Sequence, residues 1–292
     1  MITGTTKLLG VIGHPVEHSL SPLMHNAALA KLGLDYVYLP FPIEPQNLAK
    51  ALDGFAAIGV MGFNATIPHK QAIIPLLSKI EPIARAVGAV NTVFRQNDRW
   101  IGTNTDIEGF IAPLQTLDRD WSQISAVVLG NGGAARAVVA GCTQLGCTSV
   151  HLVGRNLQKL EEFKDSWQDF SSSPLGNKVN LKIHQWNSIP EIIKEANLLI
   201  NTTPIGMYPK IQDSPLNAGL FAHLPKDTVC YDLIYTPSPT KFLQYALQAD
   251  KTAIDGLEML VQQGAAALKI WLQQETVPVD VMRETLQQKL YR

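Results

Sequence analysis

The sequence predicts an α/β protein of two domains, each built around a mostly parallel β-sheet. Apolar runs of strand length alternate with helix-period segments from one end of the chain to the other, as parallel strands with crossover helices require. The 292 residues are enough for two such domains. A glycine-rich turn, "GNGG" at 130–133, stands between an apolar strand and a helix, which is typical of a nucleotide-binding unit.

The first predicted unit begins with the strand "KLLGVIG". Two further strands alternate with two helices, and a pair of short strands flanks the turn "QND". By residue number, we expect strands at 7–13, 35–41 and 58–64, helices at 21–32 and 45–55, and the two short strands within 91–106.

The second predicted unit opens with a helix and the strand "SAVVLG" before the glycine turn. Its polar stretch at 168–180 is rich in Gly, Ser and Pro, which predicts a surface loop. Its helices are expected at 106–117, 134–146 and 156–167, and its strands at 125–130, 149–154, 179–186, 196–204 and 227–235.

Two more helices are expected at the C-terminal end, at 256–271 and 279–291. They should pack back on the first domain, because that unit is short of helices on one face of its sheet. We therefore expect a substrate-binding catalytic domain at 1–106 with 257–292, and a Rossmann-type domain at 107–256.

Charge and composition exclude several classes of protein. The formal net charge is −1, which gives no electrostatic case for nucleic acid or an anionic membrane as partner. No apolar run reaches the ~18 residues of a membrane helix, and the N-terminal residues do not resemble a signal peptide. Cys142, Cys147 and Cys230 are an odd number without a CxxC pair, and we expect buried thiols. These features predict a cytoplasmic protein with a small-molecule partner.

Three small residues follow the spacing of a dinucleotide-binding turn. Gly130 permits a tight turn, Gly132 lets the backbone approach a pyrophosphate, and Ala135 lets the helix pack closely on the strand. The helix N-terminus then offers free N–H groups to the phosphates.

The strand after this turn indicates which dinucleotide binds. NAD-binding chains carry an acid at its end for the ribose 2′-hydroxyl, whereas here the strand ends in Gly154, Arg155 and Asn156. An arginine can pair with a 2′-phosphate, and Lys159 lies one helical turn further on. The alternative is a solvated arginine at a strand end; the missing acid favours NADP.

The stretch "FNATIPHK", residues 63–70, gathers hydrogen-bonding side chains where a strand passes into a helix. As a plain turn, it would use Pro68 to open the helix. As a site, it would meet a polyhydroxylated substrate at the carboxyl end of the strand, with Lys70 transferring a proton. Asn91 and Asp106 further along the chain favour the site, and the same residues can form both.

Eight motifs in the family's order make the chain resemble shikimate dehydrogenases over nearly its full length. They are "GHPVEHSLSPLMHN", "FNATIPHK", "GAVNTV", "GTNTDIEGF", "GNGGAARAV", "NTTPIGM", "YDLIYTP" and "DGLEMLVQQGAAA". The resemblance implies NADPH-dependent, reversible reduction of 3-dehydroshikimate to shikimate, on the route to chorismate and the aromatic amino acids. It also implies a cleft between two domains that closes to exclude water.

The resemblance assigns most substrate contacts to the first domain. Lys70 would be the proton-transfer group, oriented by Asp106, which would also accept a hydrogen bond from a substrate hydroxyl. Ser19 and Ser21 would bind the substrate carboxylate, and Ser21 would also cap the helix that follows. The remaining substrate contacts would be Asn64, Thr66, Asn91, Tyr235 and Gln263.

The resemblance also implies cofactor contacts along the second domain, with the Gly256 carbonyl at the nicotinamide amide. The full set is Gly130, Asn131, Gly132, Gly133, Ala134, Ala135, Arg155, Asn156, Lys159, Thr203, Leu233 and Gly256. No metal is expected, because His14, His18 and His25 lack a carboxylate at ligand spacing.

Two alternatives remain open at this point. A quinate/shikimate dehydrogenase would share the fold and use a broader range of substrates and cofactors. A non-enzymatic sensor of shikimate-type ligands would lack Lys70 or Asp106 and carry a DNA-binding segment, whereas both residues are present here. Either a monomer or a homodimer fits the sequence.

Overall fold

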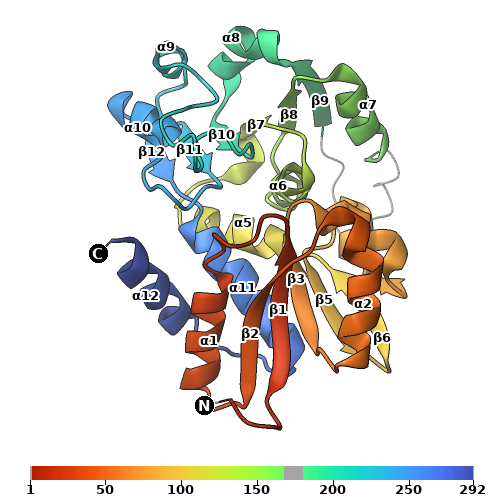
Figure 1. The fold of residues 1–292 in the computed structure, drawn as a ribbon. Coiled ribbons are helices and arrows are strands. Elements are labelled where there is room, and N and C mark those ends of the chain that lie inside the picture. The colour runs from red at the N-terminus through yellow and green to blue at the C-terminus, as the bar shows by residue number, and fades with distance from the viewer. Residues whose placement is uncertain (1, 168–179, 292) are drawn as a thin grey trace. The chain divides into compact units, whose positions relative to one another are not determined.

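The computed structural model describes residues 2–167 and 180–291, and the chain divides into two compact units. One unit comprises residues 1–109 with 260–292, and the other comprises residues 110–259. Each has its own six-stranded sheet with flanking helices (Figure 1). The predicted α/β class with mostly parallel strands is confirmed. The loop predicted at 168–180 lies outside the described residues except for its last residue.

The sheet of the first unit has the strand order β2-β1-β3-β5-β6-β4. β1 pairs in parallel with β2 and β3, while β5 runs antiparallel to both β3 and β6. β5 and β6 form the hairpin predicted around "QND", and Asn97 and Asp98 in its turn have φ of 49° and 57°. Asn and Asp tolerate this left-handed region. The strands are β1 (Lys7–Gly13), β2 (Tyr36–Pro42), β3 (Gly62–Ala65), β4 (Lys79–Ile80), β5 (Thr92–Gln96) and β6 (Arg99–Thr103).

Helices cover both faces of this sheet. α2 packs Leu52 and Phe55 into a cluster with Ile12 and Phe63 of the strands. α11 and α12 return to this unit, as predicted: α12 contacts α1, and Trp271 Nε1 of α11 donates to the Val93 carbonyl at 2.9 Å. The helices are α1 (Ser21–Lys31), α2 (Leu48–Ala57), α3 (His69–Ala72), α4 (Pro82–Val87), α11 (Leu257–Leu272) and α12 (Val279–Leu290), with 3₁₀ turns η1 (Pro45–Asn47) and η2 (Ile74–Leu76).

The sheet of the second unit is entirely parallel, in the order β12-β11-β10-β7-β8-β9. The direction of winding reverses between β7 and β10, and ligands of such sheets bind at the carboxyl ends of the strands beside that point. The strands are β7 (Ser125–Leu129), β8 (Ser149–Gly154), β9 (Asn180–Gln185), β10 (Leu198–Asn201), β11 (Val229–Asp232) and β12 (Thr252–Ile254).

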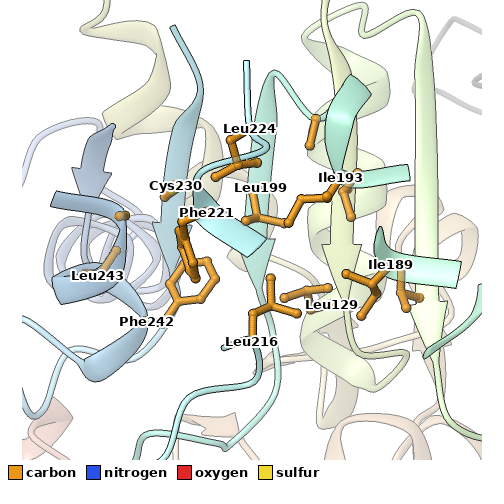
Figure 2. Packing of buried hydrophobic residues seen from close by; sticks show 14 residues of the cluster. Leu129, Ile189, Ile193, Leu199, Leu216, Phe221, Leu224, Cys230, Phe242 and Leu243 are labelled. Carbon is orange, nitrogen blue, oxygen red and sulfur yellow. The ribbon is translucent and has the colours of Figure 1, made fainter. Parts of the chain in front are cut away.

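The core of the second unit lies where short helices meet one face of its sheet. Figure 2 shows Phe221 and Phe242 beside Cys230 and Leu243. The centroids of the two phenyl rings lie 5.3 Å apart. All three cysteines are free and buried, as predicted. The helices are α5 (Asp106–Gln115), which begins in the first unit, α6 (Gly133–Gln144), α7 (Leu157–Asp165), α8 (Ile189–Ile192), α9 (Ala218–Phe221) and α10 (Lys241–Gln248), with η3 (Trp121–Gln123), η5 (Trp186–Ser188) and η6 (Ile193–Glu195). In the described ranges, no helix has the length and apolar character needed to cross a membrane.

Candidate active site

Lys70 and Asp106 form an ion pair in the first unit. Lys70 belongs to α3, which follows β3, and Asp106 begins α5, which follows β6. Nζ lies 2.5 Å from Oδ2, and the two side chains are 16% and 7% exposed. Solvent and salt screen such a sheltered pair weakly, so the carboxylate can hold the ammonium in one place. The predicted proton-transfer group and the carboxylate expected to orient it therefore lie in direct contact.

Asn91, immediately before β5, connects this pair to its surroundings. Its Nδ2 donates to Asp106 Oδ1 at 2.8 Å and to Thr105 Oγ1 at 3.0 Å, while its Oδ1 accepts the Thr105 N–H at 2.7 Å. Gln263 of α11 is buried, and its Oε1 lies 3.4 Å from the same Nδ2. Asp106 is thus held through one oxygen by Lys70 and through the other by Asn91, and both oxygens keep lone pairs for a ligand hydroxyl.

Asn64 on β3 extends this hydrogen-bonded group. Its Oδ1 accepts the Tyr38 hydroxyl at 2.7 Å, and its Nδ2 donates to the Asn91 carbonyl and to Thr92 Oγ1, both at 3.1 Å. Burial raises the pKa of the Tyr38 phenol well above its usual value, so Tyr38 remains a neutral donor. Both amide protons of Asn64 are already used, which leaves the second lone pair of Oδ1 for a ligand.

The two serines lie at the start of α1. The expectation that Ser21 caps this helix is wrong: the N-cap is Leu20, and Ser21 is the first helical residue. A capping hydroxyl must come before the first turn, and it is Ser19 Oγ that accepts the Ser21 N–H, at 3.3 Å. The Ser21 side chain instead lowers the pKa of the Tyr38 phenol slightly, against the larger effect of burial, and Tyr38 in turn donates to Asn64.

Thr66 and His69 complete the "FNATIPHK" turn. Thr66 is half-buried, its N–H donates to the Ile12 carbonyl at 2.9 Å, and its carbonyl accepts the His69 N–H at 2.7 Å. The buried His69 places Nε2 2.7 Å from the Ile43 carbonyl. His69 therefore holds the turn in place beneath Lys70.

Sequence reasoning missed three members of this group. Thr92 and Thr105 stand inside the motifs "GAVNTV" and "GTNTDIEGF", so a signal was present, whereas Tyr38 lies in an ordinary apolar strand. Of the predicted substrate residues, Tyr235 alone belongs to the second unit, where it is half-buried after β11.

The glycine turn of the second unit has the shape of a dinucleotide cradle. Gly130 has φ of 105°. Gly132 is the N-cap of α6, and a Cβ built on it would have no neighbouring atom within 4 Å, so the space beside its backbone is open. Asn131 Nδ2 is buried and has no hydrogen-bond partner among the described residues. An unpaired buried donor costs about 1–3 kcal/mol, and an oxygen of a bound dinucleotide would satisfy it. The first N–H groups of α6, at Gly133 and Ala134, add donors, while Ala135 is fully buried against the strand.

Arg155 follows β8 and lines a cavity of about 670 Å³ with Lys210, Pro204 and Ile205. Asn156 caps α7, because its Oδ1 accepts the N–H of Lys159 at 3.0 Å. Lys159 is exposed on the first turn of α7. Arg155 and the unpredicted Lys210 thus line one cavity of this unit together with a carboxylate, Asp213, so the lining carries one more cation than anion.

Thr203 and Leu233 lie on the loops after β10 and β11. Thr203 donates to Asn201 Oδ1 from both its N–H, at 3.0 Å, and its Oγ1, at 2.7 Å. The Leu233 N–H donates to the Asn201 carbonyl at 3.1 Å. Gly256 packs against Leu233 so closely that a Cβ there would lie 2.1 Å from the Leu233 carbonyl oxygen. The structure therefore brings Leu233 and Gly256 together, and only glycine fits.

Family models and curated relatives both match this chain to shikimate dehydrogenases. Residues 11–93 match the shikimate dehydrogenase substrate binding domain, and residues 256–287 match the shikimate 5′-dehydrogenase C-terminal domain. A relative from Trichormus variabilis named shikimate dehydrogenase (NADP(+)) is 66% identical over 291 residues, covering 99% of each chain.

Two solved structures extend this similarity to three dimensions. A shikimate dehydrogenase in complex with NADP⁺ is 37% identical, with a TM-score of 0.89, and the match covers 100% of this chain and 98% of the other. A shikimate 5-dehydrogenase from Thermus thermophilus, in complex with NADP(H) and shikimate, is 32% identical with a TM-score of 0.84, covering 98% and 100%.

Proposed function

The chain belongs to the shikimate dehydrogenase family, and from this premise we propose how its residues reduce 3-dehydroshikimate to shikimate. The protein is an NADP-dependent oxidoreductase of the shikimate pathway, which leads to chorismate and the aromatic amino acids. The observation that carries the mechanism is the sheltered Lys70–Asp106 pair, held through its second carboxylate oxygen by Asn91.

Lys70 and Asp106 act on the oxygen that changes during the reaction. NADPH supplies the hydride. Negative charge then develops on the former ketone oxygen of the substrate, and the Lys70 ammonium stabilises that charge and donates a proton to the oxygen. In the reverse direction the Lys70 amine accepts the proton. Asp106 keeps Nζ in place and accepts a hydrogen bond from a neighbouring substrate hydroxyl.

The other polar groups hold the substrate. Ser19 and Ser21 bind its carboxylate from the start of α1, where hydroxyls and N–H groups suit an anion. The ring hydroxyls are bound by Asn64, Thr66, Asn91 and Gln263, and Tyr235 remains a lining residue by family resemblance. The hydrogen bonds that already link Asn64, Asn91 and Gln263 support this assignment, because they orient the side chains in advance.

The second unit holds NADP. Asn131 Nδ2 and the backbone N–H groups of Gly132, Gly133 and Ala134 bind the pyrophosphate, with Gly130 and Ala135 shaping the turn. Arg155 pairs with the 2′-phosphate, supported by Asn156 and Lys159. Thr203, Leu233 and Gly256 bind the nicotinamide end. The unpaired Asn131 donor and the two cations that line one cavity, Arg155 and Lys210, support these roles.

The cellular setting is also a proposal. The buried free thiols support a reducing compartment, and we place the protein in the cytoplasm as a monomer or homodimer. Light scattering of the purified protein distinguishes the two states directly.

One assay tests the function. The purified protein is supplied with shikimate or quinate, each with NADP or NAD. We expect kcat/KM for shikimate with NADP to exceed every other combination by about tenfold or more, since each alternative changes a hydroxyl or phosphate that the site binds. Comparable rates with quinate would favour the broader dehydrogenase. Binding without turnover would favour the sensor.

A further inference from the structure

Asp232, the last residue of β11, is a fully buried carboxylate to which sequence analysis gives no role. Its Oδ1 accepts Asn201 Nδ2 at 3.0 Å and the Ile234 N–H at 3.1 Å, while its Oδ2 accepts Thr240 Oγ1 at 2.6 Å. Burial raises the pKa of Asp232 to about 6, against the opposite effect of these three donors and with a small upward contribution from Asp255. Above neutral pH the carboxylate is ionised and accepts from all three.

Asn201 makes a matching set of contacts from the neighbouring strand. It ends β10 and lies directly opposite Asp232 in the parallel register. Its Oδ1 accepts both Thr203 donors, and its Nδ2, besides binding Asp232, donates to the Ile205 carbonyl at 3.3 Å. One amide therefore shapes the loop after β10 and is itself held by the carboxylate at the end of β11.

The carboxylate also closes the loop after β11 at both of its ends. Ile234 is the second residue of this loop, and Thr240, which caps α10 by accepting the Leu243 N–H, is its last. Gly256 is attached to the same loop, because its N–H donates to the Ile234 carbonyl at 3.1 Å. The segments that carry Thr203, Leu233 and Gly256 thus all depend on the Asn201–Asp232 pair.

We propose that Asp232 and Asn201 are positioning residues that fix these two loops in advance for the nicotinamide end of NADP. The proposal rests on the proposed function, in which Thr203, Leu233 and Gly256 bind that end of the cofactor. Loops that must become ordered on binding reduce affinity, and buried hydrogen bonds that order them beforehand remove this loss. A buried network at the ligand-binding edge of the sheet therefore acts on affinity as well as on folding.

Two substitutions at Asp232 distinguish the effect of its hydrogen bonds from the effect of its negative charge. In Asp232→Asn the amide oxygen can still accept from Asn201 and Ile234, and the new N–H can donate to Thr240 Oγ1. Asp232→Ala removes every contact. We expect Asp232→Ala to weaken NADP binding, measured by calorimetry without substrate, by about tenfold or more, and Asp232→Asn to restore most of it.

Thr228→Val is the matched control, since Thr228 is equally buried just before the opposite end of β11. Its Oγ1 donates to the Ala196 and Pro225 carbonyls, away from the cofactor loops. This variant should lose stability and keep its NADP affinity. An unchanged affinity in Asp232→Ala, or an equal loss in Asp232→Ala and Thr228→Val, would overturn the proposal.

Hydrogen exchange of the cofactor-free protein gives a second readout. Amides of residues 202–206 and 233–240 should exchange about tenfold faster in Asp232→Ala than in the parent, and at the parent rate in Thr228→Val. If Asp232→Ala does not fold, Thr240→Val removes one donor to Asp232 together with the cap of α10. Amides of residues 202–206, which lie on the other loop, should then show a smaller change of the same kind; parent rates there would overturn the proposal. If the parent itself fails to bind NADP, the proposed function falls, while the exchange rates still decide whether Asp232 orders the loops.

Discussion

His25 should make the first unit lose stability in mild acid. The residue lies on α1 with no exposed surface, its ring stacks on Tyr38 with centroids 4.2 Å apart, and neither ring nitrogen has a hydrogen-bond partner among the described residues. Burial lowers the pKa of His25 from 6.5 to about 3. A charged imidazolium would have no compensating partner there, so the folded protein keeps the ring neutral.

The sign and size of this change in the free energy of unfolding follow from proton linkage. The folded pKa of His25 is below the unfolded value, so the unfolded chain binds the proton more tightly. The stabilisation is complete above pH 6.5 and is lost as the pH falls toward 3. Relative to pH 8, the loss from this residue is about 2 kcal/mol at pH 5 and about 4 kcal/mol at pH 3. The value at pH 5 hardly depends on the folded pKa, since any pKa below about 4 leaves the ring neutral at that pH.

Hydrogen exchange in α1 and β2 at several urea concentrations measures the unfolding free energy of this unit at pH 8 and pH 5. His25→Phe keeps a flat ring against Tyr38 and removes the titrating group. Between the two pH values, the parent should lose about 2 kcal/mol more than His25→Phe, and a constant packing penalty in the variant cancels. His223→Gln, which alters an exposed histidine, should behave as the parent. Equal losses in the parent and His25→Phe would refute the reasoning.

Three further outcomes are expected for the proposed active site. Lys70→Ala should lower kcat by ~10²–10⁴ with a much smaller change in KM, the usual effect of removing a general acid, and a variant that keeps a tenth of its kcat would exclude the role. Arg155→Ala should weaken NADP by about 10- to 150-fold, from the ~1.5–3 kcal/mol of a charge-assisted hydrogen bond, and leave NAD nearly unchanged; equal losses would contradict the 2′-phosphate contact. Gln263→Ala should raise KM for shikimate with NADP affinity intact, and unchanged kcat and KM would show that Gln263 does not touch the substrate.

The sequence predicted strands best where an apolar run is bounded by clear signals. β1 and β8 have the predicted limits, 7–13 and 149–154. The strand predicted at 58–64 begins only at Gly62, because α2 continues to Ala57 and Gly59, with φ of 73°, turns the chain before the strand starts. β12 and α10 were missed, since β12 has three residues at the sheet edge and α10 follows the proline-rich "TPSPT", which signals only a turn.

The residues that act on the substrate were easier to identify from the sequence than the residues that hydrogen-bond to them. Lys70 and Asp106 are 36 positions apart, and Asn91 and Gln263 are 172 positions apart. The first pair meets because β3, β5 and β6 are neighbours in the sheet, which no local spacing encodes. Tyr38 and Asp232 look like ordinary residues of apolar strands, and their hydrogen bonds appear only in the folded chain. The individual roles came from family resemblance rather than from spacing.

The way the chain enters and leaves its second unit has a consequence for synthesis on the ribosome. The crossings fall inside α5 and α11, so the second unit is one continuous segment, whereas the first needs residues from both ends of the chain. Domains form as the chain emerges, N-terminal parts first. Here the order is reversed: the nascent first unit must wait for Trp271, whose indole fills the space above Gly62 and binds the Val93 carbonyl. Until Trp271 has been synthesised, neither this packing contact nor this hydrogen bond to the sheet can form, so the first unit completes its fold only after the whole second unit has been made.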